Sequence, residues 1–203
     1  MIAVVDYGVG NLFSLQSSLN YLGLKSTVTN NAKEIMSAER VILPGVGAFA
    51  NAMQKLHETG LDEVVKAYAC TGSPLMGICL GMQVLFERGL EYGIHDGLGL
   101  LKGEVAPFAD EIVSSGLKVP HMGWNKLTVV KPCPLLKYTN DGDYVYFVHS
   151  YHARGCEASL AATSSYGTVI TAAVCKENVM GTQFHPEKSG EAGLKILKAF
   201  SEI

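Results

Sequence analysis

Two short segments of this sequence carry residues that together could perform acyl transfer on a thiol. The first is Met76-Gly77-Ile78-Cys79-Leu80-Gly81, in which a cysteine has a glycine two residues away on either side. This is the spacing of a nucleophile elbow, a sharp strand-to-helix turn, with sulfur in place of the serine oxygen. The glycines are expected because the turn is strained and has no room for a Cβ. The second segment, His185-Pro186-Glu187, offers a base for the thiol proton and a carboxylate to orient that base.

Cys79 is the predicted nucleophile, and its neighbours distinguish that role from simple packing. An isolated cysteine is usually a small buried hydrophobic residue. Here an apolar strand, Pro74-Ile78, precedes the cysteine and a helix is expected after it. The sulfur should then lie over unpaired N–H groups at the positive end of a helix, which favours the thiolate.

His185 and Glu187 follow an apolar strand predicted over Val179-Phe184. Residues two apart in an extended chain point to the same side, and Pro186 keeps His185 out of the helical region. The Glu187 carboxylate can then accept from one imidazole nitrogen while the other faces the thiol. A surface His-Pro turn is the alternative, so this segment is informative mainly because a cysteine elbow accompanies it.

An acyl-transfer site also needs N–H groups that bind the developing oxyanion. One should be the N–H of Leu80, directly after the nucleophile. The second should come from a loop that ends a neighbouring strand, and Val46 and Gly47 of Pro44-Gly45-Val46-Gly47 are the candidates. On the residues alone, this segment is equally well explained as a tight turn that the fold requires.

Motifs along the whole chain resemble those of the class I glutamine amidotransferases. The cysteine elbow and the His-Pro-Glu segment are shared across that class. Two further motifs are similar to those of glutaminase subunits of imidazole glycerol phosphate synthase, an enzyme of histidine biosynthesis: Asp6-Tyr7-Gly8-Val9-Gly10-Asn11 and His121-Met122-Gly123-Trp124-Asn125.

The resemblance implies a reaction and a partner. L-Glutamine would be hydrolysed to L-glutamate and ammonia through a thioester on Cys79, and the Pro44-Gly47 loop would supply an oxyanion donor. The ammonia would pass to a separate (β/α)₈-barrel cyclase subunit that makes imidazole glycerol phosphate and AICAR. A stand-alone cysteine hydrolase acting on peptides or γ-glutamyl compounds is an alternative. An inactive regulatory module is a further one, which the intact Cys79, His185 and Glu187 oppose.

The resemblance also assigns binding residues. For glutamine these are Gly47, Gln83, Glu91, Ser150 and Tyr151, with Glu91 pairing the α-ammonium; for the partner they are Asn11, Trp124, Tyr146 and Lys188. Without the resemblance, Glu91 is explained as an exposed carboxylate at a helix end. Gln83 is explained as part of a solvated helix face, and Trp124 as a core aromatic residue.

The elements that must position these residues alternate between strand and helix in the first half of the chain. Strands are predicted at 2–5, 25–29, 40–43 and 74–78, and helices at 12–22, 48–69 with a break near Gly60, and 80–86. The second half is richer in strands, at 101–105, 126–130, 144–149, 168–174 and 179–184, before a last helix with Ser189 as its N-cap. The pattern predicts an α/β fold with a doubly wound, mostly parallel, flavodoxin-like sheet, helices on both faces, and some antiparallel strands in the C-terminal half.

Length and composition favour one domain, residues 1–203, in a reducing cytoplasm. The formal net charge is −3 and no basic run occurs, which argues against a nucleic-acid surface. No apolar stretch reaches the ~18 residues of a membrane span, and the N-terminus is predicted to be a strand and not a signal peptide. The five cysteines are odd in number and irregularly spaced, so neither a disulfide framework nor a metal site is expected. No cofactor is predicted.

Overall fold

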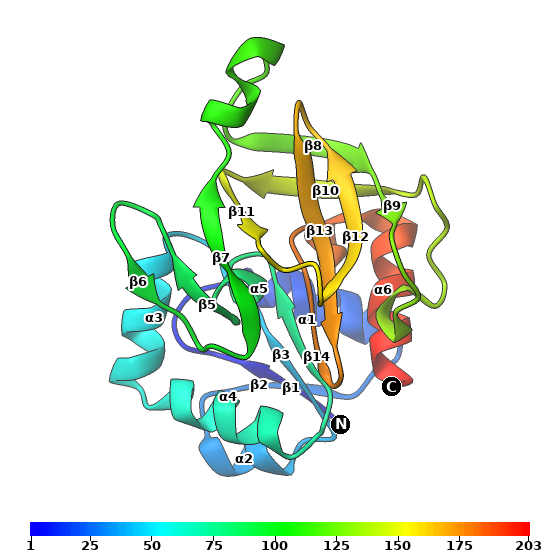
Figure 1. Ribbon diagram of the computed structural model, residues 1–203. Helices are drawn as coiled ribbons and strands as arrows, with labels where there is room; N and C mark the ends of the chain where they lie inside the picture. The colour runs from blue at the N-terminus through cyan, green and yellow to red at the C-terminus, as the bar shows by residue number, and fades with distance from the viewer.

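The computed structural model describes residues 1–203 and contains a central eight-stranded sheet. Its strand order is β2-β1-β3-β4-β14-β13-β12-β9 (Figure 1). Parallel pairing joins β2 (Ser26–Thr29), β1 (Ile2–Val5), β3 (Arg40–Leu43), β4 (Leu75–Ile78) and β14 (Val179–Thr182). Antiparallel pairing adds β13 (Val169–Lys176), β12 (Leu160–Ser165) and β9 (Thr128–Val129). The predicted α/β class, with antiparallel strands in the C-terminal half, is confirmed.

Helices cover both faces of this sheet, and its parallel strands β1, β3 and β4 are buried along almost their whole length. In β1, Ala3 and Val5 pack into a core with α2 (Ala32–Ser37), α3 (Phe49–Glu58) and α4 (Leu61–Cys70). Ile2 and Val4 point the other way, into a core with α1 (Leu12–Tyr21) and α6 (Gly190–Ser201). Side chains of a strand alternate between faces, so one short strand contributes to both cores. No helix has the length and apolar character that crossing a membrane requires.

Two smaller sheets lie beyond the carboxyl ends of the parallel strands (Figure 1). One has the order β11-β7-β5-β6, formed by Tyr151–Arg154, Leu101–Pro107, Phe86–Gly89 and His95–Asp96. The other is a two-stranded antiparallel ribbon of β8 (His121–Lys126) and β10 (Tyr144–His149). The remaining short elements are α5 (Leu80–Gln83) and three 3₁₀ turns, η1 (Asp110–Ser115), η2 (Pro134–Leu136) and η3 (Pro186–Lys188).

Several predicted elements are wrong in extent. The helix expected over 80–86 ends at Gln83, and Phe86 begins β5 instead, since the carbonyl of Val84 already bonds to Leu98 of the next loop. The strand expected at 126–130 is split between β8 and β9. The chain also contains elements that were not predicted: α2, β5, β6, β11, β12, most of β8 and the three 3₁₀ turns. The small and polar residues of β12, Leu-Ala-Ala-Thr-Ser-Ser, carry no clear strand pattern.

Candidate active site

Cys79 lies in the turn between β4 and α5 with a strained backbone. Its φ is +53° and its ψ is −114°, a combination that residues with a Cβ rarely adopt. A Cβ on Gly81 would lie 1.8 Å from the carbonyl oxygen of Leu43, and one on Gly77 would lie 2.6 Å from the backbone nitrogen of Met82. Glycine is therefore required on both sides of the cysteine, as the spacing predicted.

The helix after the cysteine is a single turn, Leu80–Gln83. One turn adds little macrodipole, so what α5 contributes is its first N–H groups, which have no intrahelical acceptor. The N–H of Leu80 is the first of these. The geometry thus leaves the Leu80 donor in the expected place, while the helix dipole contributes less than the sequence suggested.

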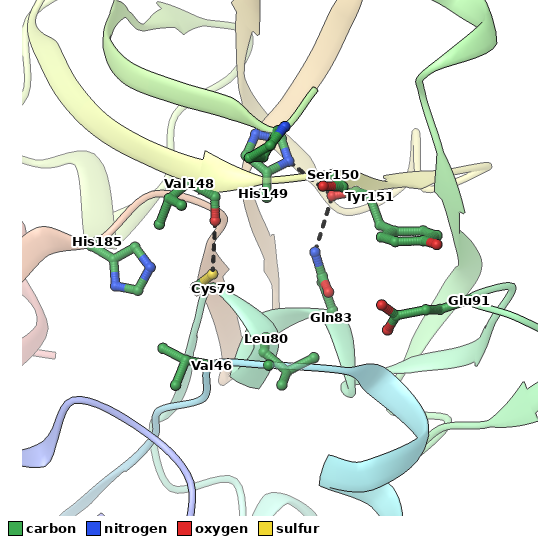
Figure 2. Close-up of a pocket in the computed structure, with 12 residues that line it drawn as sticks. Val46, Cys79, Leu80, Gln83, Glu91, Val148, His149, Ser150, Tyr151 and His185 are labelled. Carbon is green, nitrogen blue, oxygen red and sulfur yellow. Dashed lines mark hydrogen bonds between the residues drawn. The ribbon is translucent and has the colours of Figure 1, made fainter. Parts of the chain in front are cut away.

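The Cys79 sulfur lies among three polar groups, one from β10 and two from residues 183–185. The thiol is 6% exposed and its Sγ lies 3.9 Å from the carbonyl oxygen of Val148. The side-chain Nε2 of Gln183 approaches the sulfur to 3.7 Å. Figure 2 shows the His185 imidazole beside the cysteine with a ring nitrogen turned toward it. The His185 Nε2 is buried and has no hydrogen-bond partner, so it is free to engage the thiol or a substrate.

Glu187 holds the other side of the imidazole. Its Oε1 lies 2.8 Å from Nδ1 of His185, and both side chains are almost fully buried. Burial lowers the pKa of His185, but interactions with Cys79 and Glu187 outweigh burial and raise that pKa to about 10. His185 is therefore protonated at neutral pH and can supply a proton for a leaving group.

The His185 segment is fixed by its own backbone and by Ser189. His185 is extended, with φ −96° and ψ 101°, and Pro186 then opens the η3 turn. That turn, and not a continuing strand as predicted, brings Glu187 back onto the ring. Ser189 Oγ donates to the carbonyl of His185 at 2.6 Å and accepts from the backbone N–H of Tyr146 at 2.9 Å. Ser189 is the N-cap residue of α6, as predicted, but its side chain makes no capping bond there, because its hydroxyl joins the His185 segment to β10 instead.

The Pro44-Gly47 loop packs directly against the elbow. A Cβ on Gly45 would lie 2.6 Å from the Tyr7 hydroxyl and 2.8 Å from the Gly81 nitrogen. The buried Tyr7 hydroxyl donates to the Pro44 carbonyl at 2.9 Å, and its pKa is raised by burial and by the nearby charge of Cys79. Gly47 has a φ of +102° with open space around its Cβ position. Val46 and Gly47 reach the same cavity as Cys79 and Leu80.

That cavity has a volume of about 270 Å³, and most of the predicted site residues line it. Ligand clefts are typically ~300–1,000 Å³, so this one suits a substrate of amino-acid size. The set comprises Val46, Gly47, Cys79, Leu80, Gln83, Glu91, Pro120, Val148, His149, Ser150, Tyr151 and His185 (Figure 2). No group of His, Cys, Asp and Glu side chains is arranged to hold a metal ion.

Gln83 and Glu91 are both engaged with the cavity wall. Gln83 Nε2 donates to the carbonyl of Tyr151 at 3.0 Å and to Oε1 of Gln183 at 2.9 Å, so Gln83 is not on a solvated helix face. Glu91 follows β5 and does not end a helix. Its Oε2 accepts from the N–H of Phe49 at 2.6 Å, at the start of α3. The Glu91 carboxylate thus links the cavity to α3, the helix that follows the Pro44-Gly47 loop.

Three of the four predicted partner residues form one exposed cluster. Trp124 of β8 and Tyr146 of β10 are cross-strand neighbours with ring centres 6.0 Å apart, and Trp124 is 51% exposed, so it is not a core residue. Lys188 Nζ lies 5.9 Å from the centre of the Tyr146 ring. The fourth, Asn11, caps α1 and borders a small hollow that His185 and the Pro44-Val46 segment also line.

Some residues of the site were not predicted. Gln183 and His149 lay inside the motifs that carried the resemblance, but no spacing rule gave them a role. The Val148 carbonyl and the Tyr7 hydroxyl contact the site only through tertiary packing. A sequence contains no signal for such contacts.

A doubly wound α/β sheet that presents an elbow cysteine beside a buried His–Glu pair defines a class, the cysteine-dependent acyl-transfer enzymes. Comparison with known proteins narrows this class. The family model described as Glutamine amidotransferase class-I matches residues 3–202. An imidazole glycerol phosphate synthase subunit HisH from Caldanaerobacter subterraneus subsp. tengcongensis is 50% identical over 204 residues, covering 100% of this chain and 98% of the relative. The HisH subunit from Lactococcus lactis subsp. lactis is 50% identical over 202 residues, covering 99% of this chain and 98% of the relative.

A solved glutamine amidotransferase structure shares the fold. It superposes with a TM-score of 0.75 at 20% identity, covering 99% of this chain and 100% of the other. The chain belongs to the class-I glutamine amidotransferase family and, within it, to the HisH subunits of imidazole glycerol phosphate synthase. The predicted resemblance and the assignment as a glutaminase subunit are thereby confirmed.

Proposed function

We propose that this chain, as one domain spanning residues 1–203, hydrolyses L-glutamine and supplies ammonia to a cyclase partner in histidine biosynthesis. The observation that carries the proposal is the Cys79 elbow facing the His185–Glu187 pair in a cavity of amino-acid size. The HisH relatives support the partner and the pathway. The partner's (β/α)₈-barrel fold and a cytoplasmic location belong to the same proposal.

The proposed reaction has two halves. The Cys79 thiolate attacks the side-chain amide carbon of glutamine, and the oxyanion is held by the N–H of Leu80 with a second N–H from Val46 or Gly47. His185 gives its proton to the departing nitrogen, the C–N bond breaks, and ammonia leaves. The γ-glutamyl group then remains on Cys79 as a thioester. A water molecule then loses a proton to His185 and cleaves the thioester to glutamate, which restores the thiolate. Glu187 orients the imidazole throughout.

The α-ammonium and the α-carboxylate of glutamine share one carbon, and both are assigned to the part of the cavity wall that Glu91, Ser150 and Tyr151 form. Glu91, with one oxygen fixed by Phe49, can pair the α-ammonium. Ser150 and Tyr151 hold the amino-acid end through backbone and side chain. Gln83 stabilises this wall through its bonds to Tyr151 and Gln183.

The partner is proposed to dock over Trp124, Tyr146, Lys188 and Asn11. Aromatic rings that reach the surface, such as those of Trp124 and Tyr146, are enriched at interaction surfaces. These residues lie at the edge of the sheet where the carboxyl ends of the parallel strands place the cavity. Lys188→Ala should weaken capture of the cyclase subunit, whereas Lys25→Ala, at an exposed position before β2 on the opposite edge, should not.

The decisive experiment uses the complex of this chain with its cyclase subunit. Cys79→Ala should abolish glutamate release from glutamine while cyclisation with free ammonia continues at the wild-type rate. A control variant, Cys70→Ala, changes an exposed thiol and should retain both reactions. Glutamine hydrolysis that survives in Cys79→Ala would refute the mechanism. Release of glutamate from peptides in preference to glutamine would favour the stand-alone hydrolase.

A further inference from the structure

Three polar side chains form a continuous line of hydrogen bonds behind the cavity. We call Asn125, His121 and His149, with the Tyr151 carbonyl at the end, the histidine network. Asn125 Nδ2 lies 2.9 Å from His121 Nε2, His121 Nδ1 lies 3.0 Å from His149 Nε2, and His149 Nδ1 lies 2.8 Å from the carbonyl oxygen of Tyr151. His121 and His149 are 1% and 6% exposed, so solvent does not compete for these bonds.

The direction of every bond in the histidine network is fixed by its last member. A carbonyl oxygen can only accept, so His149 must carry its proton on Nδ1. Both rings are neutral, because burial lowers the pKa of His149 to about 3 and that of His121 to about 4. The Nε2 of His149 is then an acceptor, and His121 must donate from Nδ1. His121 Nε2 in turn accepts from the Asn125 amide, whose nitrogen also donates to the Ser165 carbonyl at 3.2 Å.

The position of His121 is further restricted by stacking. Its ring lies between Phe147, at a centre-to-centre distance of 4.7 Å, and Tyr166, at 4.0 Å, with interplanar angles of 21° and 19°. A ring held on both faces cannot rotate to exchange its nitrogens without displacing an aromatic neighbour. Packing as well as hydrogen bonding therefore determines which nitrogen of the His121 ring carries the proton.

The network ends on a carbonyl at the cavity wall that has a second donor. Gln83 Nε2 bonds the same Tyr151 oxygen at 3.0 Å, and Figure 2 shows both bonds converging on it. A carbonyl has two lone pairs, so this oxygen is saturated. The Tyr151 peptide is thus held from the elbow side by Gln83 and from the ribbon side by His149.

We propose that the histidine network is a positioning device for the substrate. It holds the Ser150–Tyr151 segment, and Gln83 across from it, in the orientation that receives the amino-acid end of glutamine. His149, His121 and Asn125 are positioning residues and do not touch the reacting atoms. This inference rests on the proposed glutaminase function and adds residues to its binding site.

The test is steady-state glutaminase kinetics of the complex, with isosteric replacements of His149. His149→Leu removes the donor and should raise KM for glutamine about tenfold, the effect of one buried hydrogen bond, with kcat within about threefold. His149→Asn places an amide N–H near the former Nδ1 and should recover most of that loss. His149→Gln places its amide near the former Nε2 and should not. His152→Leu is the matched control, since this buried histidine of β11 bonds Glu111 and not the network, and should leave KM unchanged.

A second measurement uses the wild-type protein, so it depends neither on enzyme activity nor on the folding of a variant. Long-range ¹H–¹⁵N correlation spectra of the full chain report the tautomer of each histidine. Neutral rings with the proton on Nδ1 are expected for His149 and His121. An Nε2–H tautomer at His149, or equal KM values for the Leu, Asn and Gln variants, would overturn the proposal. A wild-type complex without glutaminase activity would instead refute the proposed function, and the positioning role with it.

Discussion

The backbone strain at Cys79 should be measurable by comparing two inactive variants, Cys79→Gly and Cys79→Ala. A φ of +53° with a ψ of −114° is unfavourable for any residue with a Cβ, by about 1–3 kcal/mol. Glycine removes this strain. It also adds about 0.4–1 kcal/mol of chain entropy to the unfolded state and buries one methyl group fewer, worth about 0.8 kcal/mol.

A matched control isolates the strain from these other terms. Cys175 lies in the regular strand β13 and has no positive φ. There, glycine should be less stable than alanine by about 1.5 kcal/mol, the sum of the entropy and methyl terms. At Cys79, the release of about 2 kcal/mol of strain should cancel that penalty or reverse it.

The measurement is urea or thermal unfolding of the four variants under identical conditions. The glycine–alanine difference should be about 2 kcal/mol more favourable at Cys79 than at Cys175, which for a chain of this length is a shift of about 4–8 °C in Tm. Neither variant at Cys79 should release glutamate, so activity and stability are separated. The same glycine penalty at both positions would show that the elbow stores no strain.

Three further predictions concern the site. Tyr7→Phe should cost about 1 kcal/mol of stability and lower kcat, because it removes the hydrogen bond that holds the Pro44 carbonyl beside the oxyanion loop. The control variant Tyr68→Phe loses a similar buried bond, to the Ala38 carbonyl, and should lower stability alone. Urea unfolding and glutaminase assays of both variants will distinguish these outcomes. The free energy of unfolding should fall as pH rises from about 6.5 to about 10, since the folded protein there keeps a proton on His185 that the unfolded chain has lost, and His185→Asn should flatten this part of the pH profile. We expect the cyclase partner to activate this chain by completing the oxyanion hole, which acts on the transition state, so the isolated chain should have a much lower kcat than the complex with little change in KM; equal kcat values would refute that activation.

The sequence predicted the parallel half of the fold closely and the antiparallel half less well. Apolar four-residue runs such as Ile2–Val5 are buried on both faces, so composition alone identifies them. Strand β11 was not predicted because its residues, Tyr151–Arg154, mix aromatic, basic and small side chains. Its strand conformation depends on pairing with β7, a contact between distant parts of the chain.

The same distinction holds within the site. Local rules identified Cys79, because the strain and the glycine spacing are properties of a few consecutive residues. Without the resemblance, Gln83 was expected on a solvated helix face. Its amide instead bonds Gln183, which is so distant in the chain that no local rule predicts the contact. The motifs that contain Gln83 and Gln183 were both identified in the sequence, but the contact between them was not predicted. Which residues meet across strand ends is decided by sheet order, and the order was not predicted in detail.

The contacts around the cavity indicate which wall can move. On one side, the histidine network saturates the Tyr151 carbonyl, and the elbow leaves no space at Gly45 or Gly81. On the other side, a Cβ at Gly47 would meet nothing, and Val46 is 40% exposed. A close-packed segment cannot shift without moving its neighbours, whereas an open glycine can rotate its peptide. Activation by a partner should therefore act by moving Val46–Gly47. The Gln83 and Tyr151 side of the cavity should stay in place while the oxyanion donor is brought into position.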